Sequence, residues 1–257
     1  MTKSIDIDAL IAQCASEDPS SRVGAVCALE RGGREHVRRA GPALMSLLTD
    51  TDWSVRNNAA GALGTLRYVD ARQAALQQML RVDPHATPRA AAAEALGELG
   101  DPAARDALIA ALADDDFAVR MFAAISLGLL SDPSAIDALR QRLIVEPHPR
   151  TRIEILAAAL RLGDDAAFDE LMAIARGADE ERRSDLCNAL DDLLYRTTPA
   201  ALIDRADELD QQLAAWDCPK LRERLAAVRG GAAQVAAQVA AQSAAQGEDA
   251  APSPTDS

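Results

Sequence analysis

The sequence has few aromatic residues and few of the residues that favour β-strands. Phe, Trp and Tyr make up 3% of the chain, whereas 49% of it is apolar. Most of this apolar content is Ala and Leu, and β-branched residues, which are typical of strands, never dominate a window. The composition therefore argues against a β-rich fold and favours an all-α one.

Positive charge is also scarce. The 27 Lys and Arg residues are outnumbered by 40 Asp and Glu, so the net charge is −13, and Lys3 and Lys220 are the only lysines. Such a surface repels phosphate backbones and anionic lipids. We therefore expect that the protein binds neither nucleic acid nor a membrane.

The sequence lacks a C-x-x-C pair, because its cysteines stand apart at Cys14, Cys27, Cys187 and Cys218. This spacing argues against a zinc site or a dithiol motif. The first residues lack the basic and apolar pattern of a secretion signal, and no window is apolar enough to span a membrane. We expect a cytoplasmic protein with reduced thiols.

A repeat centred on arginine runs through most of the chain. The aligned segments are "SSRVGAVCALE" at Arg22, "SVRNNAAGALG" at Arg56, "TPRAAAAEALG" at Arg89, "AVRMFAAISLG" at Arg120, "RTRIEILAAAL" at Arg152 and "ERRSDLCNALD" at Arg183. Successive arginines are 31 to 34 residues apart. A nearly fixed period of this length indicates a solenoid of stacked units.

Each unit is predicted to contain two helices. The second begins near the arginine and keeps apolar residues on one face. The first follows a stop-and-cap signal such as "GDP" at 100–102, "SDP" at 131–133 or "GDD" at 163–165. A further pair, at 198–214 and 219–229, lacks the arginine and is interpreted as a C-terminal cap.

These units resemble HEAT repeats, specifically the bacterial phycobilisome-lyase HEAT-like repeat. The matching motifs are "VRNNAAGALGTL", "PRAAAAEALGELGDPAARDALIAAL" and "VRMFAAISLGLLSDPSAIDAL", and the resemblance covers about residues 5–195. It implies an all-α, right-handed α-solenoid (superhelix) of about six HEAT-like helical hairpins plus a C-terminal helical cap. The predicted solenoid spans 1–229, with repeats near 5–32, 34–68, 70–100, 101–131, 132–163 and 164–195 and the cap at 198–229.

Residues 230–257 form an Ala/Gln-rich tail that is predicted to be mostly disordered. Gly230 and Gly231 are expected to break the last helix. The repeated "AAQV" motif could form a marginal Ala-rich helix, and "EDAAPSPTDS" has a composition typical of disordered segments.

Two recurring features are interpreted as structural. An acid stands six residues before the arginine in four units, so that Asp50, Asp83, Asp114 and Glu146 are paired with Arg56, Arg89, Arg120 and Arg152. Because arginine binds carboxylates through two parallel hydrogen bonds, we expect a charge ladder that joins neighbouring repeats, in preference to an anion-binding track. Gly64, Gly97 and Gly128 stand eight residues after the arginine and predict a close approach of stacked helices.

One face of the second helices is predicted to meet solvent. Positions one, five and nine after the arginine share this face, and in most units they are polar. The polar members include Asn57, Thr65, Glu94, Glu98 and Arg161. In the fourth unit the positions hold Met121, Ile125 and Leu129, with Phe122 beside them. Exposed apolar surface of this kind often marks an interaction site, and the resemblance places it on the concave surface.

Other side chains leave alternatives open or suggest no chemistry. Trp53 and Phe117, three residues before the arginine, either anchor a partner or fill the groove between repeats. His85 and His148 are two repeats apart, too far to share a metal ion. Deoxyhypusine hydroxylase, a HEAT-like metalloenzyme, uses His-Glu pairs, but the chain has only the reversed pair Glu35-His36.

We therefore expect a non-catalytic protein–protein interaction scaffold or adaptor. A partner protein with a basic face would bind on the concave face. The predicted partner-binding residues are Met121, Phe122, Ile125, Leu129, Asn57, Glu94, Glu98, Arg161, Trp53 and Phe117. No catalytic or metal-binding residue and no cofactor is predicted. The resemblance also leaves an alternative: a bilin lyase-type or other chromophore-handling enzyme, or its regulatory subunit.

Overall fold

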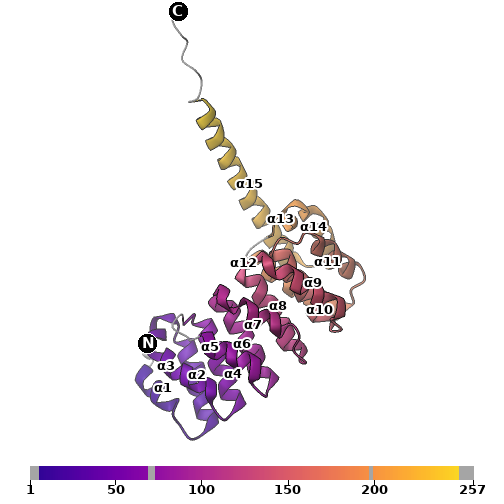
Figure 1. Cartoon of the computed structure of the whole chain (residues 1–257). Helices are drawn as coiled ribbons and strands as arrows, with labels where there is room; N and C mark the ends of the chain where they lie inside the picture. The colour runs from indigo at the N-terminus through magenta and orange to yellow at the C-terminus, as the bar shows by residue number, and fades with distance from the viewer. Residues whose placement is uncertain (1–5, 69–72, 197–198, 249–257) are drawn as a thin grey trace, which may run out of the picture. The chain divides into compact units, whose positions relative to one another are not determined.

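The computed structural model describes residues 6–68, 73–196 and 199–248 (Figure 1). All regular secondary structure in these residues is helical, which confirms the all-α prediction. The chain divides into two compact units, the first ending at Leu171 and the second beginning at Met172. None of the described helices combines the length and the apolar character that crossing a membrane requires.

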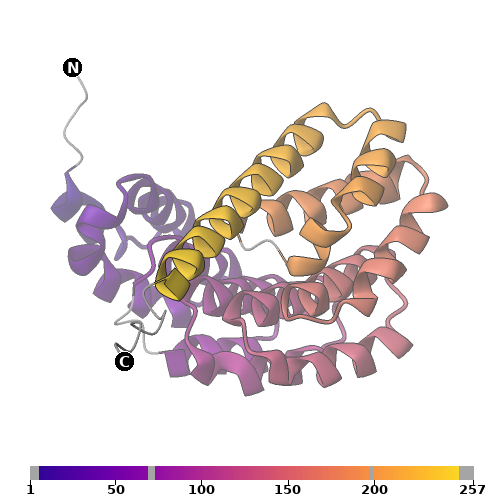
Figure 2. The same cartoon turned by 90° about the horizontal axis from the view of Figure 1, so that it is seen from above.

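The helices of the first unit follow one another in pairs (Figure 2), one pair for each of the first five predicted repeats. The pairs are α1 (Ile7–Gln13) and α2 (Pro19–Arg31), α3 (Val37–Ser46) and α4 (Trp53–Thr65), α5 (Gln73–Val82) and α6 (Ala86–Leu99), α7 (Arg105–Ala111) and α8 (Phe117–Leu130), and α9 (Ile136–Val145) and α10 (Pro149–Arg161). Short 3₁₀ turns, such as Pro102–Ala104, lead into several of the first helices.

The second helices of the pairs pack side by side. α2 contacts α4, α4 contacts α6, α6 contacts α8, and α8 contacts α10. Leu63, Leu96 and Leu127 occupy equivalent places along this series, and each is fully buried. The stacked-hairpin solenoid that the arginine repeat predicts is therefore present in the first unit.

The helix boundaries follow the stop-and-cap signals. Gly100 ends α6 in the left-handed conformation, with φ at +71°, and the side chain of Asp101 accepts a hydrogen bond from the Ala103 N–H. Ser131 takes the corresponding place after α8, with φ at +56°. The second helices use the same device at their start, because Asp116 accepts hydrogen bonds from the first backbone N–H groups of α8.

The recurring mid-helix glycines lie where neighbouring helices come closest. A Cβ on Gly64 would stand 2.7 Å from the Ala95 Cα, and one on Gly97 would stand 2.8 Å from the Ser126 Cα. These distances are shorter than carbon atoms tolerate. The packing of α4 on α6 and of α6 on α8 therefore requires glycine, as the sequence predicted.

The second unit includes the helices that follow the fifth pair. It contains α12 (Glu180–Arg196), α13 (Ala200–Asp204), α14 (Ala206–Ala215) and α15 (Pro219–Glu248), while α11 (Ala166–Arg176) spans the point where the units meet along the chain. Within this unit α15 contacts α12, α13 and α14.

The expected break at Gly230 and Gly231 is wrong. The helix α15 continues through both glycines to Glu248, and Figure 1 shows it as one unbroken yellow helix. Two glycines cost about 1 kcal/mol each in a helix, but they permit the helical backbone, and the Ala-rich segment after them favours it. The predicted disorder of residues 249–257 falls outside the described residues.

Candidate partner-binding surface

In the first four repeats, the arginine that marks the repeat binds the acid of the following repeat. Two parallel hydrogen bonds join Arg56 to Asp83, at 2.6 and 2.8 Å, and two of 2.8 Å join Arg120 to Glu146. Two bonds of 2.8 Å also join Arg89 to Asp114, and a single bond of 2.7 Å joins Arg22 to Asp50. The predicted ladder between repeats is therefore present, but the predicted partners are wrong by one repeat. Each acid binds the arginine of the preceding repeat and not the arginine six residues after it.

The guanidinium group of each ladder arginine is also held within its own repeat. Nη1 of Arg120 donates to the carbonyls of Asp114 and Asp115, both at 2.9 Å, so one residue ties two loops together. Arg120 is 5% exposed and Glu146 is 3% exposed. Buried guanidinium groups with these partners hold the stack together and are not presented to an external anion.

The electrostatics of the ladder are clearest at Glu146. Burial acts to raise the pKa of this carboxyl group. Hydrogen bonds from Arg120, from the His148 N–H and from Arg142 outweigh burial and lower the pKa to about 2. Glu146 is therefore ionised at neutral pH and stabilises the folded state in that form.

Trp53 and Phe117 each stack on a histidine of the next repeat. The ring centroids are 6.0 Å apart for Trp53 and His85, and 4.0 Å apart for Phe117 and His148. Both aromatic rings nevertheless remain about 40% exposed, at 43% for Trp53 and 42% for Phe117. These side chains bridge adjacent loops, and their contact with a partner stays a prediction.

The apolar residues predicted to face outward on α8 do not share one degree of exposure. Phe122, Ile125 and Leu129 are half-buried, but Met121 is only 5% exposed. The predicted exposure of Met121 is therefore wrong. The equivalent residues Ala90 and Ile153 are buried too, whereas Val23 and Asn57 at the same position are half-buried.

The polar residues predicted on the same face range from exposed to half-buried. Glu94 is exposed, and Asn57, Glu98 and Arg161 are half-buried. Glu94 stands on α6 at the position that Ile125 occupies on α8, and these helices pack side by side. The acidic and apolar parts of the predicted surface are therefore on neighbouring helices.

A hollow of about 250 Å³ opens on this face between α4 and α6. Its lining comprises Arg34, Gly61, Gly64, Thr65, Glu94, Ala95 and Glu98. Gly61 of α4 leaves open space where another residue would place a side chain. Glu94 and Glu98 contribute carboxylates, and Arg67 lies 3.8 Å from Glu98. Arg34 contributes a guanidinium group to the same lining.

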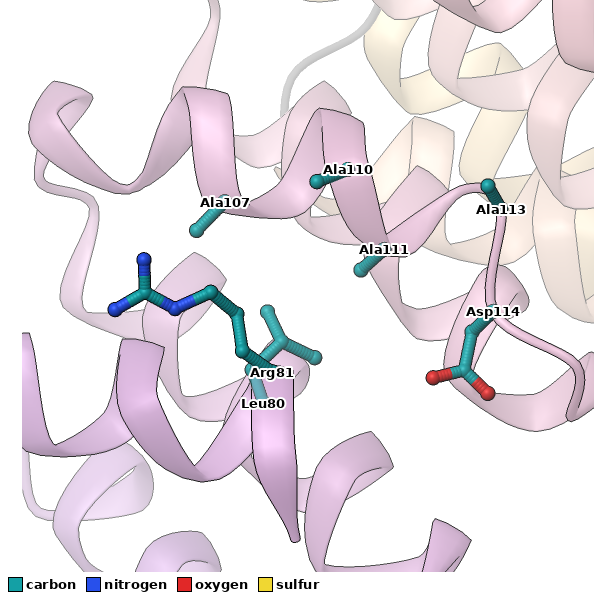
Figure 3. A pocket seen from close by; sticks show the side chains of 7 residues that line it. All are labelled: Leu80, Arg81, Ala107, Ala110, Ala111, Ala113 and Asp114. Atoms are coloured by element: carbon teal, nitrogen blue, oxygen red, sulfur yellow. The ribbon is translucent and has the colours of Figure 1, made fainter.

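A second hollow, of about 210 Å³, lies between α5 and α7 (Figure 3). Alanines of α7 form much of its wall, and Figure 3 shows Arg81 and Asp114 at opposite ends. Asp114 is already bound to Arg89 through the ladder. The hollow offers no nucleophile with a neighbouring base. In the part of the chain that the structure describes, no group of three His, Cys, Asp or Glu side chains could hold a metal ion.

Several exposed apolar side chains lie outside the predicted surface. Ile144 and Val145, the last residues of α9, are 82% and 64% exposed, and Val82 at the end of α5 is 62% exposed. The aligned positions all lie on the second helix of each repeat, so they do not include the ends of the first helices. Their position at the last turn before a loop was the available signal.

Stacked helical hairpins joined by an arginine–carboxylate ladder define an α-solenoid repeat protein. The family model for HEAT repeats matches residues 7–79 and 73–159, together more than half of the chain. The chain belongs to this family, which confirms the resemblance found in its motifs. No match was found among curated proteins.

Solved structures show the same fold. The complex of CpcE and CpcF of phycocyanin lyase from Nostoc sp. PCC7120 is similar, with 23% identity and a TM-score of 0.65, covering 89% of this chain and 95% of that one. YibA of Escherichia coli is similar with 20% identity and a TM-score of 0.52, covering 88% and 91%.

Proposed function

We propose that the protein is a non-catalytic scaffold that binds a partner protein on the exposed face of α4, α6 and α8. The observation that carries this proposal is the hollow between α4 and α6, with Glu94 and Glu98 in its lining. The half-buried side chains of Ile125 and Leu129 stand at equivalent positions on the adjacent helix α8. Together these features suit a protein segment that combines basic and apolar side chains.

The chemistry of each part fits one side of such a segment. A Lys or Arg side chain of the partner enters the hollow and meets Glu94 and Glu98. Its apolar neighbours cover Phe122, Ile125 and Leu129. Apolar contacts at the centre of an interface supply most of its binding energy, while the net charge of −13 speeds association with a basic surface.

The remaining predicted residues have supporting places in this proposal. Asn57 on α4 and Arg161 at the end of α10 lie toward the two ends of the series of second helices. Trp53 and Phe117 begin α4 and α8, where their exposed ring surface extends the contact beyond the hollow.

Affinity capture from native lysate, read out by quantitative mass spectrometry, tests the proposal. The test variant carries Ile125→Glu and Leu129→Glu, and the control carries Ile144→Glu and Val145→Glu, which places the same charge on the exposed end of α9. We expect the wild type and the control to recover the same partner and the test variant to lose it. Circular dichroism establishes that all three are folded. Equal recovery by all three proteins contradicts the proposal.

The alternative is a bilin lyase-type or other chromophore-handling role. It is favoured by the similarity to the complex of CpcE and CpcF of phycocyanin lyase. One measurement separates the two proposals. Bilin is added to the purified protein, unbound bilin is removed by gel filtration, and the visible absorbance of the protein is recorded. The lyase proposal predicts a retained band, and the scaffold proposal predicts none.

A further inference from the structure

Two cysteines that are far apart in the sequence meet in the second unit. Cys187 lies on α12, and Cys218 immediately precedes α15. Their sulfur atoms are 3.4 Å apart, and both residues are half-buried. The pair is therefore in contact and still partly accessible to small reagents.

The turn that ends α14 brings Cys218 to this place. Asp217 adopts the left-handed conformation, with φ at +56°, and reverses the direction of the chain. The N–H of Cys218 donates to the Leu213 carbonyl at 3.0 Å, and that of Asp217 donates to the Ala214 carbonyl at 3.1 Å. This pair of bonds is a Schellman turn. Because α12 packs on α15, the fixed turn holds Cys218 against Cys187.

We propose that Cys187 and Cys218 form a site of reversible oxidation, at which a small-molecule disulfide such as oxidised glutathione converts the two thiols into an intramolecular disulfide. The chain loses two electrons and two protons, and one S–S bond forms. The S–S bond of the oxidant breaks, and it leaves as two thiols. The two reactions balance without any further reagent.

The surroundings of the two sulfur atoms assign an order to the steps. Burial, the hydrogen bond with Cys218 and the charge of Asp191 raise the pKa of Cys187 to about 12. Cys187 therefore keeps its proton at neutral pH, and the sulfur of Cys218 attacks the oxidant first and releases one thiol. Cys187 then loses its proton to solvent and attacks the Cys218 sulfur, which releases the second thiol.

Forming the bond requires a small movement at a place that can supply it. The sulfur atoms must approach from 3.4 Å to about 2.05 Å. Cys218 stands between two helices, where a turn can adjust more readily than a helix interior. The bond would then tie α12 to the start of α15 and enclose α13 and α14 in a covalent loop.

Peptide mapping of the oxidised protein tests this proposal. The reduced full-length chain is incubated with oxidised glutathione at pH 8 and digested without reduction. We expect an intact mass lower by two hydrogens, a linked peptide that contains Cys187 and Cys218, and complete reversal by dithiothreitol. Faster formation at higher pH is expected, because the resolving thiol of Cys187 must lose its proton.

Matched variants separate this pair from general thiol oxidation. A Cys14→Ser and Cys27→Ser protein, which changes only the first unit, is expected to form the same linked peptide. Cys187→Ser is expected to accumulate a glutathione adduct on Cys218 instead. The proposal is overturned if the wild type keeps four free thiols, carries only glutathione adducts, or forms links between chains. The wild-type map decides this result even if a variant fails to fold.

Discussion

At the scale of single residues, the recurring arginine is the residue that joins one repeat to the next. In each ladder pair the guanidinium group bonds to a carboxylate of the next repeat and to carbonyl oxygens of its own. Such a pair need not add stability relative to an apolar pair of equal volume. Removing one member, however, leaves the other charged and buried.

We predict that Arg120→Met destabilises the first unit by about 3–5 kcal/mol, because it leaves the Glu146 carboxylate buried without its main partner. Denaturant unfolding monitored by circular dichroism measures this change. The control is Arg39→Met, which removes an exposed pair with Asp8 and should cost about 0–1 kcal/mol. Equal effects of the two substitutions contradict the structural role assigned to the ladder.

The ladder also predicts how stability depends on pH. The pKa of Glu146 falls from an ordinary 4.5 to about 2 on folding, and the pKa values of Asp83 and Asp114 are lowered as well. A carboxyl group whose pKa is lowered by folding stabilises the folded state at pH values above its pKa in the unfolded state. This contribution is lost as the pH falls from about 4.5 to about 2. Glu146→Gln should be less stable at pH 7, and its stability should fall less steeply over that range. Acid titrations of the two proteins, followed by their free energies of unfolding, measure this difference. If the pair were unimportant, the two free energies would depend on pH in the same way.

The sequence predicted these residues because each contact recurs with the repeat. An acid or a glycine at a fixed distance from the arginine in several units indicates one structural role, repeated. The exposure of Met121 could not be predicted in this way, because it depends on how far neighbouring helices close over its position. The contact between Cys187 and Cys218 depends on a single turn at Asp217. This turn does not recur in the repeats, so the repeat pattern could not predict it.

At the scale of the helices, the close approach of α4 to its neighbour α6 depends on a glycine. Gly61 and Gly64 lie in the same helix but differ in their surroundings. A Cβ on Gly64 would clash with the backbone of Ala95, whereas one on Gly61 would meet nothing within 4 Å. The same element therefore contains a glycine that packing requires and one that it does not.

We predict opposite effects for the two substitutions in α4. Gly64→Ala should destabilise the first unit by about 1–3 kcal/mol, because α4 and α6 must move apart. Gly61→Ala should stabilise it by about 0.5–1 kcal/mol, because alanine favours the helix. Thermal unfolding of the two variants and the wild type gives the comparison. A stabilising Gly64→Ala would show that the helices do not approach as closely as described.

Helix boundaries were predictable where a signal reverses the chain and unpredictable where it only weakens a helix. "GDP" and "SDP" combine a left-handed residue with a capping carboxylate, and both end their helices. Gly230 and Gly231 lack such a cap, and α15 continues through them. A glycine pair without a cap lowers helix stability, but it does not by itself end a helix.

At the scale of the molecule, most of the chain maintains the stack, and one face of the first unit presents varied side chains. Ladder, glycine and cap positions repeat with nearly the same residues. Positions five and nine after the arginine change from Glu94 and Glu98 on α6 to Ile125 and Leu129 on α8. A constant framework with a variable face is the arrangement on which the scaffold proposal rests.

The acidic part of this face should govern the rate of partner binding. We predict that Glu94→Gln with Glu98→Gln slows association with the captured partner about tenfold at low salt, and that the difference shrinks as salt screens the charges. Glu180→Gln with Glu181→Gln is the control, because it changes the net charge equally on the exposed first turn of α12. Surface plasmon resonance at several salt concentrations provides the rates. If both variants slow association equally, net charge and not the hollow is responsible.

Hydroxyl-radical footprinting of the free protein and of its complex with the captured partner tests the central claim most directly, because it reports the solvent access of individual side chains. The account predicts that Phe122, Ile125 and Leu129 become protected in the complex, while Ile144, Val145 and Val82 react as they do in the free protein. Protection confined to Ile144, Val145 and Val82, with Ile125 and Leu129 unchanged, would contradict it.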